Sequence, residues 1–247
     1  MFYMDPTYIL VLLGVVITLI AQSKLKSTYA NYSRKQASCG MTGAQVAQMI
    51  LRKNGIYDVS VGHINGTLTD HYDPKKKLVN LSDATYAQTS IAAISVAAHE
   101  CGHAIQDNTE YAPLKIRTIF APVANIGAKL AWPLILAGFF LGMLASNAAQ
   151  MGLGNGTSIG GLLMQIGVFA YLLAVVFQFL TLPVEYNASK RAENQLSAIG
   201  IIADNEKSSV KSVLDAAALT YVAGTAASAL QFLRIFMLFG GRGNNRR

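Results

Sequence analysis

Long apolar runs alternate along this chain with stretches that carry nearly all of its charge. The apolar runs cover residues 8–21, 130–144, 159–183 and 216–239. A hydrocarbon core of about 30 Å requires roughly 20 apolar residues in a helix, so the pattern predicts three or four membrane-spanning helices. Arg234 interrupts the fourth run. We expect that segment to pack on the polar domain and touch the membrane interface.

The polar stretch at residues 23–117 predicts a small α+β domain. A helical pattern follows Thr42, which suits an N-cap, and stops before Gly55, which suits the residue after a helix end. Three short extended segments come next, at residues 58–61, 67–73 and 78–81. Turn-forming residues separate them, so they predict a three-stranded meander. A second helical pattern covers residues 90–107.

Composition supports a membrane protein. Hydrophobic residues make up 52% of the chain and charged residues 13%, about half the usual charged share, which leaves too few charges to solvate an ordinary soluble surface. The two cysteines exclude a disulfide scaffold. The net charge is +7, but no platform of interleaved basic and aromatic residues accompanies it, so we expect no binding to nucleic acid.

The distribution of positive charge predicts an orientation in the cell membrane. Residues 23–117 contain eleven Lys and Arg, whereas the connection at 145–158 contains none. Positively charged loops favour the cytoplasmic side, so we expect a multi-pass protein whose polar domain faces the cytoplasm. The expected organisation is an N-terminal membrane helix (1–22), a cytoplasmic domain (23–117), a membrane hairpin (118–183), helices that complete the domain (184–239) and a disordered basic tail (240–247).

The second helix of the polar domain contains an H-E-x-x-H motif, from His99 to His103. Residues four apart lie on one face of a helix, so both imidazoles can bind one metal ion. Glu100 is placed to reach a water on that metal without being a ligand itself. Zinc lowers the pKa of such a water to about 7, and a carboxylate can then take its proton as it attacks a carbonyl. The motif predicts a Zn²⁺ site with Glu100 as the catalytic base.

A catalytic zinc needs a third protein ligand and an open fourth position. Glu185 directly follows the third apolar run, and two membrane crossings bring it back to the side of His103. His63 and His71 lie on predicted strands and are alternatives, although a histidine on a strand more often faces solvent. Cys101 lies about 200° around the helix from His99 and points away from the metal. We therefore favour Glu185.

Two motifs resemble those of membrane gluzincin metalloproteases. Residues 95–106 are similar to their zinc helix, and residues 185–189 (EYNAS) are similar to their Glu-x-x-Ala-Asp motif. Nearly the whole chain resembles the bacterial YugP-type neutral zinc metallopeptidases. The resemblance implies peptide hydrolysis at the membrane by a zincin-like domain, with an edge strand before the zinc helix pairing with extended substrate. It implies these roles: zinc ligands His99, His103 and Glu185, and catalytic base Glu100.

One residue departs from the wider gluzincin pattern. Ser189 occupies the position where Asp is usual, and that Asp would orient a histidine ligand. Asp70 and Glu193 are candidates to replace it, and the sequence does not decide between them.

The leading hypothesis is an α-helical membrane protein with three or four spanning helices and a small cytoplasmic α+β zincin-like domain. It would be a zinc endopeptidase acting on polypeptides, membrane proteins among them, at the surface of the lipid bilayer. One alternative is an intramembrane zinc protease, which the apolar residues 91–98 before the motif would suit, although that run is short. Another is a non-catalytic membrane scaffold that zinc stabilises.

Overall fold

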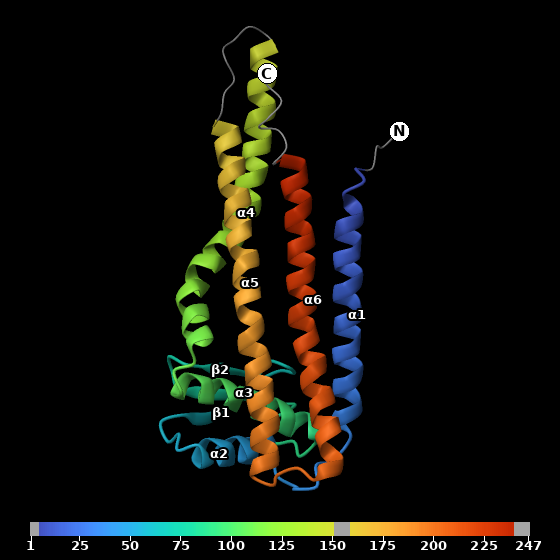
Figure 1. Ribbon diagram of the computed structural model, residues 1–247, viewed down its shortest axis with the longest axis vertical. Helices are drawn as coiled ribbons and strands as arrows, with labels where there is room; N and C mark the ends of the chain where they lie inside the picture. The colour runs from blue at the N-terminus through green and yellow to red at the C-terminus, as the bar shows by residue number, and fades with distance from the viewer. Residues whose placement is uncertain (1–4, 151–158, 240–247) are drawn as a thin grey trace. The chain divides into compact units, whose positions relative to one another are not determined.

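The computed structural model describes residues 5–150 and 159–239. The chain is mostly helical and contains one small sheet (Figure 1). In chain order the elements are α1 (Tyr8–Ser33), α2 (Gly43–Lys53), β1 (Ser60–Ile64), β2 (His71–Asp73), β3 (Leu78–Ser82), α3 (Ile91–Asn108), α4 (Ala112–Gln150), α5 (Ile159–Ala198), a short 3-10 helix (Asp204–Glu206) and α6 (Lys207–Phe239).

Contacts within the chain divide it into two units. We call residues 18–115 and 181–223 the site unit. The helical unit comprises the other described residues, which are 5–17, 116–150, 159–180 and 224–239. Helices α1, α4, α5 and α6 each contribute residues to both units.

Helix α2 begins and ends where the sequence predicts. The Thr42 hydroxyl accepts a hydrogen bond from the Gln45 backbone N–H, and the Gln45 side chain accepts one from the Thr42 N–H. This capping box satisfies two donors that the first turn leaves open. At the other end, Gly55 has a φ of +70°. The apolar face of α2, with Val46 and Ile50 fully buried, lies in the core of the site unit.

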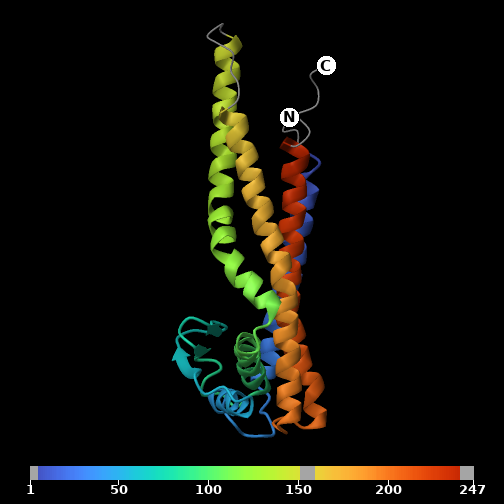
Figure 2. The ribbon, with the colours of Figure 1, turned by 60° about the vertical axis from the view of Figure 1, so that its left-hand side comes forward.

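Helix α3 is the buried centre of the site unit. Its N-cap is Ser90, whose hydroxyl accepts a hydrogen bond from the Ala93 N–H. Its sequence is apolar and rich in alanine on nearly every face, which is expected for a helix that is covered on all sides. Most residues of α3 are indeed buried. Figure 2 shows α3 between the sheet and the C-terminal part of α5.

The sheet has the order β1–β3–β2, so the predicted meander is wrong. Strand β3 is central, antiparallel to β2 and parallel to β1, with Ser60 opposite Leu78. Val79 and Leu81 of β3 are fully buried, and the central position covers this most apolar strand on both edges. Residues 65–77 separate β1 from β3, and a connection of that length is what a parallel pair requires.

Strand β2 is shorter than the predicted 67–73 segment because a side chain ends its ladder. The Asp70 carboxylate accepts hydrogen bonds from the Ser82 backbone N–H at 2.7 Å and from its hydroxyl at 2.8 Å. Asp70 thus takes the place of a backbone partner beside β3. Leu68 has a φ of +58°, a left-handed conformation that no regular strand contains.

Helices α3 and α5 approach each other closely at Gly102. A Cβ atom at this position would lie 2.5 Å from the carbonyl oxygen of Ala188, nearer than non-bonded atoms can come. Only glycine therefore permits this spacing between the two helices. Gly102 lies inside the H-E-x-x-H motif, and Ala188 lies three residues after Glu185.

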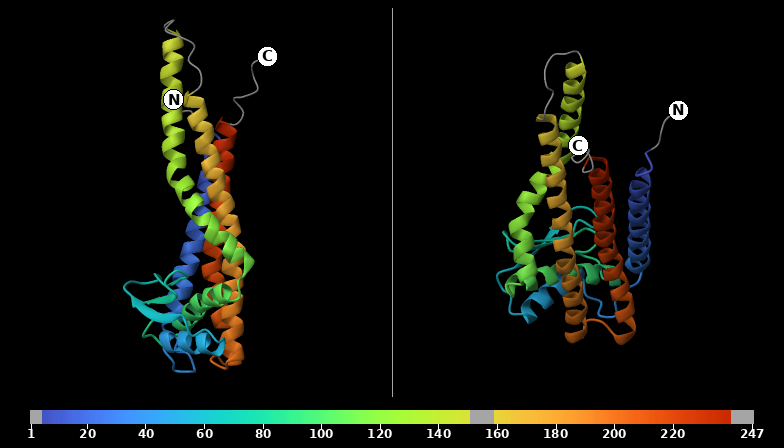
Figure 3. Two further views of the ribbon diagram at one scale, coloured as in Figure 1. Left: turned by 90° about the vertical axis from the view of Figure 1, so that its left-hand side faces the viewer. Right: turned by 45° about the horizontal axis from the view of Figure 1, so that its top comes forward.

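Four of the described helices, α1, α4, α5 and α6, are long and apolar enough to cross a membrane. Helix α4 is bent (Figure 3), and it contains Pro122 and Pro133, which interrupt backbone hydrogen bonding. Helix α5 continues past Pro183 to Ala198, so the third apolar run and Glu185 belong to one helix. The described part of the chain is accordingly mostly helical, with four candidate membrane-spanning helices and a small sheet.

Helix α6 is long and apolar enough to span a membrane even though it contains Arg234. The Arg234 guanidinium lies 4.0 Å from the centroid of the Tyr8 ring and interacts with Asp5, so the charge is directed to polar groups at one end of α1. Small residues bring α1 and α6 close, since a Cβ on Gly14 would lie 3.2 Å from Ala227 Cα. The structure thus favours counting α6 as a fourth candidate span, against our expectation that it only touches the interface.

Replacing Gly102 with Ala tests the contact between α3 and α5. Overpacking of this kind typically costs about 1–3 kcal/mol, and we expect Gly102→Ala to lower the Tm measured by circular dichroism in detergent. Gly224→Ala is the control, because no atom outside its own helix lies within 4 Å of a Cβ there, so helix propensity alone should leave it neutral or more stable by up to about 1 kcal/mol. Equal Tm values for both variants would contradict the close contact.

Candidate metal centre

Helices α3 and α5 bring His99, His103 and Glu185 together. The two histidines lie one turn apart on α3, with ring centroids 4.9 Å apart. Glu185 projects from α5, and its Oε2 lies 3.3 Å from His99 Nε2 and 3.5 Å from His103 Nε2. One ligand atom from each residue falls within 4.8 Å of the other two. Three of the side chains that the sequence singled out therefore form one cluster that could hold a metal ion.

The spacing of these atoms fits zinc. Tetrahedral coordination with bonds of about 2.1 Å places neighbouring ligand atoms about 3.4 Å apart, which matches both distances from Glu185 Oε2. Two imidazoles and one carboxylate are also a common donor set for catalytic zinc. Glu185 is only 2% exposed, and burial of a carboxylate beside two imidazoles is costly unless a cation compensates it.

Glu100 lies next to the cluster and is buried. Burial raises the pKa of its carboxyl to about 7, and nearby groups have smaller effects: the His99 side chain and a backbone hydrogen bond from Tyr72 lower this pKa, whereas the Glu185 and Asp70 carboxylates raise it. A carboxyl group with this pKa can both accept and return a proton near neutral pH. Glu100 also lines a cavity together with His99.

Each histidine contacts a neutral partner through its other ring nitrogen. His99 Nδ1 lies 3.1 Å from the Ser189 hydroxyl oxygen, and His103 Nδ1 lies 3.0 Å from Gln106 Oε1. Ser189 therefore occupies the orienting position itself. Asp70, one of the two carboxylates considered as its replacement, binds Ser82 instead.

The orientation of the Gln106 amide determines the tautomer of His103. Gln106 Nε2 donates to the Val184 carbonyl oxygen at 2.8 Å and to Asn187 Oδ1 at 3.0 Å, so its Oε1 must be the atom that faces His103. An amide oxygen accepts only, and His103 Nδ1 must therefore carry the proton. That leaves the lone pair of Nε2 directed at Glu185, as a metal ligand requires.

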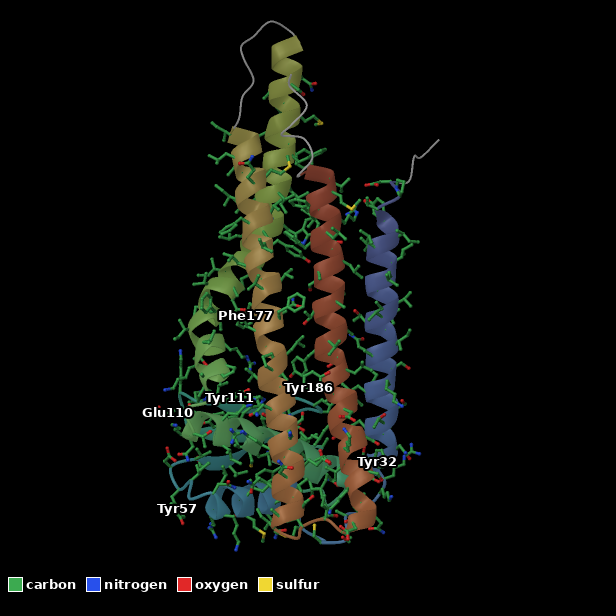
Figure 4. The ribbon with its side chains drawn as sticks, in the orientation of Figure 1. Tyr32, Tyr57, Glu110, Tyr111, Phe177 and Tyr186 are labelled. Atoms are coloured by element: carbon green, nitrogen blue, oxygen red, sulfur yellow. The ribbon has the colours of Figure 1, made fainter. Side chains whose placement is uncertain are left out.

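Asn187 and Arg191 extend this network along α5. Arg191 Nε donates to Asn187 Oδ1 at 2.7 Å, and its guanidinium lies 5.8 Å from the centroid of the Tyr111 ring. Figure 4 labels Tyr111 just beyond the end of α3. Sequence reasoning assigned no role to these residues or to Gln106. The available signal was spacing, since Gln106 lies three residues after His103 and so shares its helix face.

The remaining candidates lie elsewhere. His63 Nε2 contacts Asp83 at 2.7 Å. His71 is exposed, and its ring nitrogens contact the Thr69 carbonyl and the Asn80 amide. Cys101 directs its thiol at the Ala47 carbonyl of α2, 3.6 Å away. None of the three belongs to the cluster found among the described residues.

Comparisons with known proteins show the family of this chain. Residues 7–240 match the model of the family described as "Putative neutral zinc metallopeptidase", and the chain belongs to this family. It is 44% identical over 226 residues to the "Putative membrane protease YugP" of Bacillus subtilis (strain 168), and the match covers 91% of this chain and 93% of that protein. No solved structure matches. The zinc metallopeptidase family implies zinc as the cofactor.

We expect the partners of the histidine Nδ1 atoms to control zinc affinity. Loss of such a partner typically weakens metal binding about 10–100-fold, so Gln106→Leu should raise the zinc Kd by that factor in competition titrations with a fluorescent chelator. Ser189→Asp should lower the Kd, because a carboxylate accepts more strongly from His99. Gln195→Leu is the control: it breaks hydrogen bonds to Asn54 and should leave the zinc Kd unchanged. Equal Kd values in all four proteins would contradict this assignment.

Proposed function

We propose that this chain is a membrane-bound zinc endopeptidase that hydrolyses polypeptides at the cytoplasmic surface of the membrane. The observation that carries the proposal is the convergence of His99, His103 and Glu185 with buried Glu100 beside them. In this proposal the first three residues are zinc ligands and Glu100 is the catalytic base. Bound there, zinc would act as a Lewis acid toward the scissile carbonyl and would lower the pKa of a water.

The chain's own residues supply the proton transfers. Glu100, whose pKa of about 7 suits both directions of transfer, accepts a proton from the attacking water and returns it to the leaving amine. Gln106 keeps the Nε2 lone pair of His103 directed at the centre, and the Ser189 hydroxyl holds the His99 ring in place through Nδ1. Burial of the cluster excludes bulk water from these groups, which strengthens their electrostatic effect.

The sheet supports a polypeptide substrate. β2 is an edge strand that pairs with β3 on one side, and the backbone of Tyr72 in β2 reaches Glu100. An extended peptide that adds to the outer edge of β2 would therefore lie against the catalytic carboxylate. The name of the relative from B. subtilis describes a membrane protease, which is consistent with this substrate class.

Two observations support a site at the membrane surface on the cytoplasmic side. Among the described helices, α3 is not one of those long and apolar enough to span, which disfavours an intramembrane protease. Residues 23–117 carry eleven Lys and Arg and residues 145–158 carry none, which favours a cytoplasmic location for the former. A zinc-stabilised scaffold would need a closed fourth ligand, and Cys101, which contacts Ala47, is not directed at the cluster.

Zinc content of the purified full-length chain tests the ligand set. We expect about one zinc ion per wild-type chain after dialysis against a mild chelator, and loss of that zinc in Glu185→Ala, because a three-ligand site cannot retain the metal with two. Glu193→Ala removes a carboxylate from the same helix, outside the cluster, and should keep the zinc. Retention of zinc by Glu185→Ala would show that Glu185 is not the third ligand.

Activity of Glu100→Gln tests the role of the base. The variant should retain zinc and hydrolyse an unfolded protein substrate about 10²–10⁴-fold more slowly than wild type, as measured by the release of new amino termini. Full zinc content together with unchanged hydrolysis would refute the mechanism. Zinc-loaded wild type without any hydrolysis would instead favour the scaffold.

A further inference from the structure

A cavity of about 170 Å³ lies beside His99 and Glu100 in the site unit. Its walls come from α1, α3, α6 and the segment before β2. In the site unit, α1 and α6 run side by side (Figure 1). The remaining lining residues are Leu25, Tyr29, Leu68, Asp70, Val96, Val213, Leu214, Ala217, Thr220 and Tyr221.

The lining is mainly apolar and aromatic. Its one charged residue apart from Glu100 is Asp70, and both carboxylate oxygens of Asp70 accept hydrogen bonds from Ser82. Asp70 is therefore already engaged, and together with Glu100 it would repel an acidic group. An apolar cavity of about 150 Å³ is large enough to hold benzene, so this one has room for a single side chain of that size.

Three of the residues that line the cavity come from three different segments of the site unit. Val96 lies one turn before His99 on α3, and Ala217 faces the cavity from α6. Leu68 adopts a left-handed backbone conformation, which is unfavourable for leucine and occurs mainly where a structure has a use for it. Here that conformation places an apolar side chain in the cavity wall.

We propose that this cavity binds the side chain of the substrate residue next to the cleaved bond, and that it selects an apolar side chain the size of Leu or Phe. The proposal rests on the proposed function, because it concerns the same site. The proposal adds that residues of α1 and α6, together with α3, determine which substrate side chain is accepted.

Binding of amino-acid hydroxamates tests the cavity without requiring turnover. Four probes, with methyl, isobutyl, benzyl and carboxymethyl side chains, are titrated into the zinc-loaded full-length protein in detergent. A methylene in an apolar pocket changes affinity by about tenfold or more, so isobutyl and benzyl probes should bind at least tenfold more tightly than methyl. The carboxymethyl probe should bind most weakly.

Two variants should change this preference in opposite directions. Ala217→Leu fills the cavity and should abolish the advantage of isobutyl and benzyl over methyl. Val96→Ala enlarges it and should favour benzyl over isobutyl. Ala30→Leu makes the same change as the first variant at an exposed position on α1 and should bind like wild type. Zinc content of each variant verifies that the site is intact.

The results separate failure of this inference from failure of the proposed function. Equal affinity for the four probes, tightest binding of the carboxymethyl probe, or an unchanged preference in both cavity variants would overturn the inference. Absence of binding by every probe would overturn it too, since the cavity would then not be open to a ligand. The proposed function fails separately, if hydrolysis does not depend on Glu100.

Discussion

The close approach of α3 and α5 at Gly102 and Ala188 is the constraint on which the site depends. His99 and His103 stand on either side of Gly102 on α3, and Glu185 lies just before Ala188 on α5. A Cβ at Gly102 would lie only 2.5 Å from the Ala188 carbonyl oxygen, so no side chain fits between the helices. The approach brings carboxylate and imidazole atoms to 3.3–3.5 Å. A wider spacing would separate the two halves of the ligand set.

The hydrogen bonds around the cluster explain why its geometry is well defined. Gln106 joins the two helices, because its amide contacts His103 on one side and Val184 and Asn187 on the other. Ser189 contacts His99 across the same interface. Both orienting groups are neutral, so among the described residues the carboxyl groups buried at the centre are those of Glu185 and Glu100. Such a centre is suited to a divalent cation, and the neutral partners leave the histidines less basic than carboxylate partners would.

The sheet and the helices divide the tasks of substrate binding in the proposed enzyme. An edge strand offers backbone hydrogen bonds, which are indifferent to side-chain identity. The cavity between α1, α3 and α6 offers shape and apolar surface, which discriminate between side chains. A protease that degrades varied polypeptides needs the backbone hydrogen bonds of the edge strand. Its selectivity between side chains can come only from the cavity.

Local patterns in the sequence determined the helices, their caps and the pair of histidines, because each depends on residues within a few positions of one another. The H-E-x-x-H spacing placed both imidazoles on one face, and the capping residues marked the ends of α2. Glu185 could be chosen over His71 only with the count of membrane crossings and a family resemblance. The order of the strands, the continuity of α5 through Pro183 and the partners of the histidines were decided by tertiary structure. Ser189 and His99, for example, are 90 residues apart, and no local pattern reports a contact that two packed helices create.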